Sequence, residues 1–174
     1  RQWLARGGKR LRPFVTLAAY DALTRDPDQP PNLLADDCEF PLPVRRVAAA
    51  MEAFHKASLV HDDIEDDDAY RYGRKTLHCE YDLNAAINIG DHLIGLGYRL
   101  VTQSRKELDP GMVADIADRL ALAHLKLCDG QGAELRWNGA HAASLTALEA
   151  MKIYSLKTAP AFEAALYAGL RLAG

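Results

Sequence analysis

The chain has 174 residues and a formal net charge of −3, with 49% hydrophobic and 26% charged residues. This size and composition suit one globular domain with a sizeable core. The charge gives no indication of nucleic-acid binding, because no basic stripe is present. No apolar stretch reaches transmembrane length. The three cysteines form no zinc or disulfide spacing, which favours free thiols in a reducing compartment and hence a cytoplasmic protein.

Helix-forming residues dominate, β-branched runs are scarce, and no stretch keeps a two-residue alternation for long. The pattern therefore predicts an all-α domain. We expect helices over residues 14–23, from Val44 through an acidic segment, over 84–101, over 112–137 and from Thr146 onward, with a proline-rich loop over 25–43. Thr146 and Glu149 have the spacing of a capping box for the last helix.

A basic segment, Gly7-Gly-Lys-Arg-Leu-Arg-Pro13, precedes the first predicted helix. Two glycines leave the backbone accessible, and a helix N-terminus favours anions, so this segment is a candidate phosphate site. It is not a Walker loop, because it lacks the fixed glycine spacing and the Ser/Thr after lysine. A basic turn ahead of a helix is the simpler alternative.

Six of the seven residues from Asp62 to Asp68 are carboxylates. Residues four apart share a helical face, so Asp62 and Asp66 are expected to point the same way, with Asp63 to one side. Their spacing suits Mg²⁺, which is held by one or two carboxylates together with water and phosphate oxygens. A solvated acidic helix end is the alternative interpretation.

Basic and polar residues flank this acidic segment. His55 lies two helical turns before Asp62 on nearly the same face, about 10 Å away, and this alignment favours a functional role over a core histidine. Arg71, Arg74 and Lys75 follow in a glycine-containing turn. Metal ions on one side and arginines on the other could bind a polyphosphate from both ends. A local set of salt bridges is the alternative.

Polar and glycine positions also stand out in the later helices. Asp91 lies in a mostly apolar segment, which is consistent with a buried, hydrogen-bonded acid or with a group that supports a metal ligand, and we favour the buried acid. Gly130 and Gly132 each cost a helix about 1 kcal/mol relative to alanine, so close packing or ligand approach should justify them. Lys157, next to Thr158, can meet a phosphate as a point charge, although one such pair can arise by chance.

Taken in order, these motifs resemble the trans-isoprenyl diphosphate synthases, the polyprenyl synthetase family. The matching residues are Gly8-Lys9-Arg10-Leu11-Arg12-Pro13, His55, Asp62-Asp63-Ile64-Glu65-Asp66, Arg71 with Gly73-Arg74, Gly130-Gln131, and Lys157-Thr158. The aspartate-rich motif alone is only moderately specific, because terpene cyclases share it. Six elements in the family's order and approximate spacing are far more specific.

The resemblance implies a bundle of long, mostly antiparallel helices around a deep apolar cavity, usually in a homodimer. It implies a Mg²⁺-dependent enzyme that ionises an allylic diphosphate and condenses it head to tail (1′-4) with isopentenyl diphosphate. The implied residues are Asp62, Asp63 and Asp66 for Mg²⁺; Arg71 and Lys157 for the allylic diphosphate; Gln131, Lys157 and Thr158 for catalysis at the allylic group; and Gly8, Lys9, Arg12 and His55 for isopentenyl diphosphate.

Product length follows from the same resemblance. In the family, bulk just before the first aspartate-rich motif limits how far the prenyl tail grows. This chain has Ala57 and Ser58 at those positions. We therefore expect a product of geranylgeranyl length or longer.

The chain departs from the family pattern in two ways. Tyr72 stands where the family usually has a second arginine, assigned to isopentenyl diphosphate, and Arg74 is the nearest substitute. The family's second aspartate-rich motif lies beyond the Lys-Thr pair and is not among these 174 residues. We therefore expect residues 1–174 to be a single domain that forms the N-terminal half, or somewhat more, of a synthase, incomplete at its C-terminal end and not competent alone.

Three other functions compete with a prenyltransferase. A non-catalytic or regulatory subunit of the same fold would bind diphosphates and need a partner, and Tyr72 supports it. A terpene cyclase-like lyase shares the metal–diphosphate chemistry, but it has no second diphosphate for the basic segment and His55 to bind. A helical interaction domain would leave the ordered basic motifs as coincidence.

Overall fold

Helices make up most of the chain in the computed structural model, which describes residues 7–34, 39–139 and 145–174. The helices are α2 (Leu11–Thr24), α3 (Leu42–Glu65), α4 (Leu77–Glu80), α5 (Leu83–Gln103), α6 (Pro110–Gly139) and α7 (Ala147–Ala173), with short 3₁₀ turns η1 (Asn32–Leu34) and η2 (Ser104–Lys106). The predicted all-α class is confirmed. Cys79 and Cys128 are free thiols, whereas Cys38 and part of the predicted 25–43 loop lie outside the described residues.

Helix starts follow the local chemistry of the sequence. The predicted capping box opens α7: the Thr146 hydroxyl accepts a hydrogen bond from the Glu149 backbone N–H, and the Glu149 carboxylate accepts one from the Thr146 backbone N–H at 2.9 Å. Asp82 caps α5 by accepting a 2.7 Å hydrogen bond from the Ala85 backbone N–H. Both caps satisfy N–H groups that a helix end otherwise leaves unpaired.

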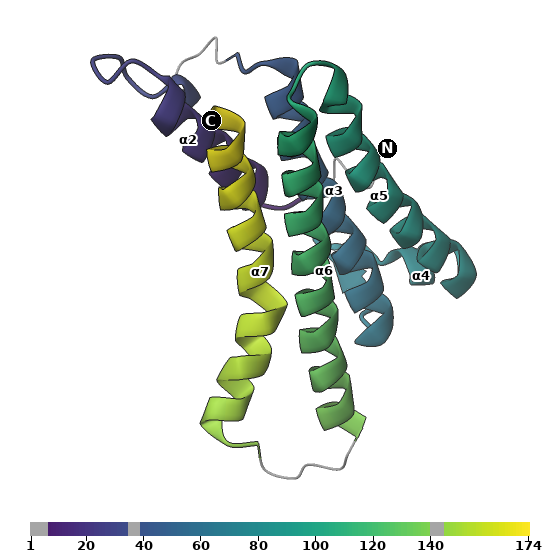
Figure 1. Cartoon of the computed structure of the whole chain (residues 1–174). Coiled ribbons are helices and arrows are strands. Elements are labelled where there is room, and N and C mark those ends of the chain that lie inside the picture. Colours follow the sequence, from purple (N-terminus) through teal and green to yellow (C-terminus); the bar gives the residue numbers. More distant parts are fainter. Residues whose placement is uncertain (1–6, 35–38, 140–144) are drawn as a thin grey trace.

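The long helices pack in antiparallel pairs. In Figure 1, α6 and α7 run side by side in opposite directions. Helix α3 packs mainly against α5 and also contacts α2 and α7. Near the C-terminus α7 packs against α2, where the Thr16 hydroxyl donates a 3.0 Å hydrogen bond to the Ala165 carbonyl. One apolar core joins α3, α6, α7 and the end of α5, with α2 packed against it, and a smaller one joins α3, α4 and α5.

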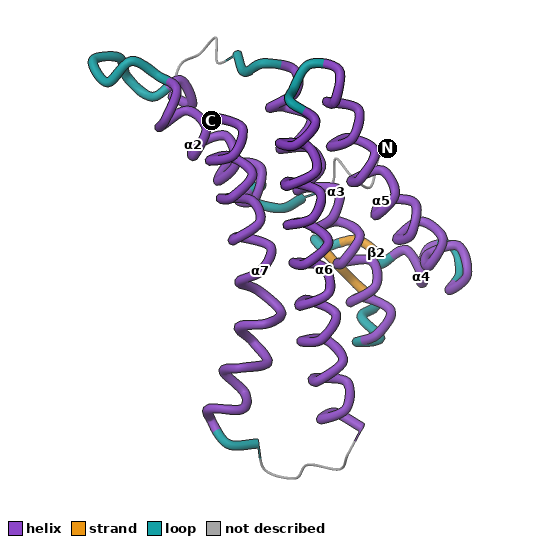
Figure 2. Tube along the Cα trace, viewed as in Figure 1, coloured by secondary structure: helices purple, strands orange, loops and turns teal. Residues whose placement is uncertain are grey.

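A short β-hairpin follows the acidic segment, in the position of the predicted basic turn. Strands β1 (Tyr70–Arg71) and β2 (Arg74–Lys75) pair antiparallel, and Figure 2 shows them in orange behind α6. Tyr72 and Gly73 both have positive φ, 52° and 73°, as a tight two-residue hairpin turn requires. The hairpin returns the chain along the end of α3, which brings Arg71 back towards the carboxylates.

Two expectations about single residues have different outcomes. Asp91 is exposed on α5, 3.5 Å from the imidazole of His61, so the prediction of a buried acid is wrong. Close packing explains the glycine at position 130, because a Cβ there would lie 2.9 Å from the Lys157 backbone nitrogen on α7. Gly132 has open space around its Cβ position and lines a cavity instead.

Candidate active site

A cavity of about 340 Å³ lies among α3, α5, α6 and α7. Its inner part is apolar and includes Met51, Phe54, Leu120 and Ala164. A second cavity of about 380 Å³ shares several of its lining residues and adds others from α6 and α7. The shared residues are Arg12, His55, Ser58, Asp62 and Lys157. The two cavities therefore meet along a polar border, with the apolar space on one side of it.

The predicted metal ligands occupy different positions at the end of α3. Asp62 lines both cavities, Asp66 is exposed one turn later, and Asp63 is buried and lines neither. Burial raises the pKa of Asp62 to about 6, and repulsion by Glu65 and Asp66 adds to the effect, against Lys157 and Arg71. The cations near Asp62 therefore do not fully offset the cost of burying its carboxylate.

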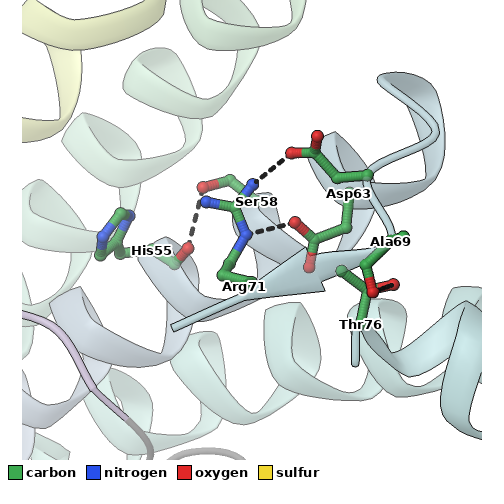
Figure 3. Close-up of polar contacts among 7 residues, drawn as sticks. His55, Ser58, Asp63, Ala69, Arg71 and Thr76 are labelled. Atoms are coloured by element: carbon green, nitrogen blue, oxygen red, sulfur yellow. Dashed lines mark hydrogen bonds and ion pairs between the residues drawn. The ribbon is translucent and has the colours of Figure 1, made fainter. Parts of the chain in front are cut away.

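Arg71 lies against α3 rather than on the cavity surface. Its guanidinium bonds to the buried carboxylate of Asp63 (Figure 3) and, at 3.3 Å, to the carboxylate of Asp68. Burial raises the pKa of Asp63, while its hydrogen bond with Arg71 opposes that shift. The structure therefore brings Arg71 to the acidic segment, but as the partner of Asp63.

Lys157 faces the carboxylates from α7. Its ammonium donates to Glu134 on α6 and lies near Asp62 and Asp66. Burial lowers the pKa of Lys157, but the bond to Glu134 and the nearby carboxylates outweigh it, so the net shift is upward. Thr158, like Lys157, lines the second cavity.

Gln131 lies on α6 in the lining of the first cavity. Both its amide oxygen and nitrogen are buried, and neither has a hydrogen-bond partner in the described part of the chain. A buried amide without partners is costly unless a ligand or water satisfies it. Gln131 is thus placed to contact a bound molecule.

The residues predicted for isopentenyl diphosphate gather at the start of α2 and on α3. Gly8 has a φ of 88°, a left-handed conformation that favours glycine, and Lys9 is exposed beside it. The Arg12 guanidinium stacks over the Phe162 ring, 4.7 Å from its centroid, and its buried Nε has no hydrogen-bond partner in the described residues. His55 borders both cavities, and burial together with nearby Arg12, Lys56 and Arg71 lowers its pKa to about 3.

The two small residues predicted to control product length line the apolar cavity. Ala57 is 1% exposed, and the Ser58 hydroxyl donates a 2.9 Å hydrogen bond to the His55 carbonyl (Figure 3). One turn earlier, the Phe54 ring packs edge-on against Tyr98, with ring centroids 4.8 Å apart. The small residues therefore border open space, and aromatic rings border its inner end.

Sequence reasoning missed two contributors. Glu134, which holds Lys157, follows Gly130-Gln131 by one helical turn, and that spacing could have suggested it. Lys56 is buried within α3, and a lysine on the same helical face as the apolar residues Ala53 and Val60 was the available signal. Neither residue has a sequence motif that reveals its partner.

Among the described residues no three His, Cys, Asp or Glu side chains are close enough together to hold a metal ion. Mg²⁺ does not require such a cluster, because it binds through one or two carboxylates and keeps water or phosphate oxygens as its other ligands. The carboxylates of Asp62 and Asp66 fit that requirement. In the described part of the chain, no helix is long and apolar enough to cross a membrane.

Comparison with known proteins agrees with this arrangement. Residues 1–174 match the polyprenyl synthetase family model. The chain is 33% identical over 175 residues to a geranylfarnesyl diphosphate synthase of Natronomonas pharaonis, covering 95% of this chain and 48% of the relative. It is 32% identical over 176 residues to a farnesyl diphosphate synthase of Geobacillus stearothermophilus, covering 98% and 54%.

Solved structures give the same result. A geranylgeranyl pyrophosphate synthetase from Pyrococcus horikoshii superimposes with a TM-score of 0.84 at 33% identity, covering 99% of this chain and 47% of that one. A Helicobacter pylori geranyltransferase complexed with magnesium and isoprenyl diphosphate also gives 0.84, at 26% identity and 99% and 54% coverage. The chain spans about half the length of the curated relatives it matches. It belongs to the polyprenyl synthetase family.

Proposed function

We propose that the intact protein containing this chain is a Mg²⁺-dependent trans-prenyltransferase, which joins an allylic diphosphate head to tail (1′-4) to isopentenyl diphosphate. The observation that carries this proposal is the border between the two cavities. Carboxylates and basic side chains lie along it, and an apolar space opens on one side. Two charged head groups and one hydrocarbon tail require such an arrangement.

The first step breaks the C1–O bond of the allylic substrate, and the electron pair leaves with the diphosphate. Lys157 offsets the negative charge that develops on the leaving group, and Arg71 does so after exchanging Asp63 for phosphate oxygens. Mg²⁺ held by Asp62 and Asp66, with Asp63 in support, would supply further charge stabilisation when bound. Gln131 and Thr158 lie beside the resulting allylic cation.

The second step forms the new carbon–carbon bond. The double bond of isopentenyl diphosphate attacks C1 of the allylic cation, and the proton lost from its C2 goes to the released diphosphate. Gly8, Lys9 and Arg12 hold the isopentenyl head group, and His55, neutral because of its low pKa, contributes one N–H donor. Apolar residues around the cavity exclude water, which would otherwise capture the cation as an alcohol.

We also propose that the product is of geranylgeranyl length or longer, because Ala57 and Ser58 leave the cavity open. The protein acts as a homodimer in the cytoplasm. Exposed apolar side chains on and next to α5, including Tyr81, Leu83 and Ile87, offer a surface for self-association.

A non-catalytic subunit is the second candidate, and Tyr72 is the observation that favours it. Such a subunit would bind diphosphates through the same residues but would elongate nothing without a catalytic partner.

The deciding experiment incubates the intact protein with Mg²⁺, isopentenyl diphosphate and allylic primers of several lengths, and then analyses the products. Elongation of at least one primer supports the enzyme. No elongation of any primer, with binding of isopentenyl diphosphate retained, favours the subunit.

A further inference from the structure

Asp63 has one carboxylate oxygen to which no contact has yet been assigned. Its side chain is only 2% exposed, and Oδ1 accepts the hydrogen bond from Arg71 (Figure 3). The second oxygen, Oδ2, is buried and has no hydrogen-bond partner in the described part of the chain. A buried carboxylate oxygen without a donor is costly. Asp63 lines neither cavity, so a molecule bound in those cavities is not the expected donor.

His78 has the complementary deficit. It lies in α4, the short helix that follows the hairpin. Both of its ring nitrogens are buried, and neither has a hydrogen-bond partner among the described residues. An imidazole has at least one N–H donor in either protonation state, whereas an ionised carboxylate only accepts. Since His78 also lies outside both cavities, it and Asp63 each lack what the other offers.

Backbone hydrogen bonds return the chain from Asp63 to the start of α4. The Asp68 backbone N–H donates to the Asp63 carbonyl at 2.9 Å. The Thr76 backbone N–H then donates to the Ala69 carbonyl at 3.1 Å, which closes the base of the hairpin. His78 follows Thr76 by two residues, so the hairpin holds it near the end of α3.

Core packing fixes α4 in the same place. Leu77 is 3% exposed and belongs to the smaller apolar core with Val60, which lies three residues before Asp63 on α3. The imidazole of His78 is close enough to act on the carboxylate: burial raises the pKa of Asp63, Arg71 opposes that shift most strongly, and His78 also opposes it. The two unpaired groups therefore lie near one another.

We propose that His78 is a positioning residue for Asp63, and that its imidazole takes over the hydrogen bond to this carboxylate when Arg71 leaves it for the diphosphate of the allylic substrate. The inference rests on the proposed function, in which Arg71 exchanges Asp63 for phosphate oxygens. A small shift of the imidazole, or one bridging water, joins His78 to Oδ2. His78 thereby lowers the cost of releasing Arg71 to the substrate.

The test uses His78→Phe, which keeps a ring and removes both nitrogens. Titration calorimetry on the intact protein measures binding of a non-ionisable allylic thiodiphosphate in the presence of Mg²⁺. We expect its Kd to rise about fivefold or more, as an unpaired buried acceptor predicts, with the Kd for isopentenyl diphosphate unchanged. His92→Phe, at an exposed position on α5, is the matched control.

Conservative variants test whether the N–H donor matters. His78→Asn and His78→Gln place an amide N–H near the position of Nδ1 and of Nε2, respectively, and at least one of them should restore binding of the allylic analogue. Unchanged binding in His78→Phe, equal weakening of both ligands, or no rescue by either amide would overturn the proposal.

A second background separates positioning from packing. In Arg71→Met no arginine leaves Asp63 when the substrate binds, so adding His78→Phe should weaken binding of the allylic analogue no further. A purely structural role for His78 predicts the same weakening in both backgrounds, and that result would reject the exchange of partners.

Nitrogen NMR of the His78 ring tests the unaltered protein, where no variant can misfold. A hydrogen-bonded imidazole N–H should appear when Mg²⁺ and the allylic analogue bind, and unchanged ring signals would contradict the proposal. None of these measurements needs turnover. If the unaltered protein binds the analogue but elongates no primer, the proposed catalysis fails and the role of His78 is still decided. If it does not bind the analogue, both proposals fail.

Discussion

The two ends of the cavity-facing part of α3 differ in their charge. The C-terminal end carries Asp62, Asp63 and Asp66, which are partly offset by Arg71 and Lys157. Two to three turns earlier, Lys56 and the arginines from the start of α2 surround Glu52. An acidic end attracts metal ions and a basic one attracts phosphate. One helix therefore presents an acidic region and a basic region, and under the proposed function this difference in charge would direct the two diphosphates to separate regions.

The largest expected effect comes from removing a carboxylate from the acidic end of α3. Asp62→Asn removes the carboxylate that borders both cavities, and we expect elongation to slow about 100- to 1,000-fold, the range for losing one transition-state electrostatic contact. Product formation at saturating Mg²⁺ measures it. Asp67→Asn is the control, because Asp67 is exposed with a φ of 53° that asparagine tolerates. Equal loss in both variants would point to general acidity rather than to a site at Asp62.

The segment between the two ends can be tested through product length. Ala57→Phe or Ser58→Phe places a ring in the cavity and should shorten the main product by at least one isoprene unit. Chromatography of the dephosphorylated products measures the change. Ala49→Phe, on the exposed face of α3, should leave the products as they are. The same product distribution in all four proteins would refute the assignment of these positions.

Lys157 depends on close contact between α6 and α7, which Gly130 permits. Gly130→Ala would bring a Cβ within 2.9 Å of the Lys157 backbone nitrogen, and we expect it to lower the free energy of unfolding by about 1–3 kcal/mol. Urea denaturation measures the change. Gly132→Ala has free space and should be neutral or stabilising by up to about 1 kcal/mol. Equal stabilities for the two variants would contradict the packing described for Gly130.

The smallest expected effect is on the pH dependence of the free energy of unfolding, through His55 near the basic region of α3. The folded-state pKa of His55 is lowered from 6.5 to about 3. As the pH falls, the unfolded chain therefore binds a proton at His55 before the folded protein does. Its contribution to stability is complete above about pH 6.5 and is lost as the pH falls towards 3. His55→Gln should therefore reduce the loss of stability between pH 7 and pH 5 by about 1–2 kcal/mol. Denaturation at the two pH values measures this, and parallel pH curves for both proteins would contradict a buried neutral His55.

The sequence predicted most of the fold and part of the site. Helical periodicity and capping chemistry are local, so the helices and the Thr146 cap were predictable. The alignment of Asp62 with His55 also follows from helix geometry alone, and both residues border the cavities. Partners that come from distant segments were not predictable. Nothing local indicates that Glu134 holds Lys157 or that Tyr72 covers Gly7. By contrast, the pairing of Arg71 with Asp63 belongs to the local set of salt bridges that the sequence analysis gave as an alternative.

Asp91 shows the limit of burial predictions from sequence. Its neighbours are apolar, but its place on the helix turns it outward towards His61 rather than into the core. The exposure of Asp91 follows from its position around the helix axis. The average hydrophobicity of the surrounding segment does not determine it.

The central claim is that the cavity-facing part of α3 carries one subsite at each of its two ends. Titration calorimetry in the presence of Mg²⁺ tests it most directly, with isopentenyl diphosphate in one set and a non-ionisable allylic thiodiphosphate in the other. The account predicts that Asp62→Asn weakens binding of the allylic analogue alone, and that Arg12→Met weakens binding of isopentenyl diphosphate alone. Equal weakening of both ligands in both variants would contradict two separate subsites.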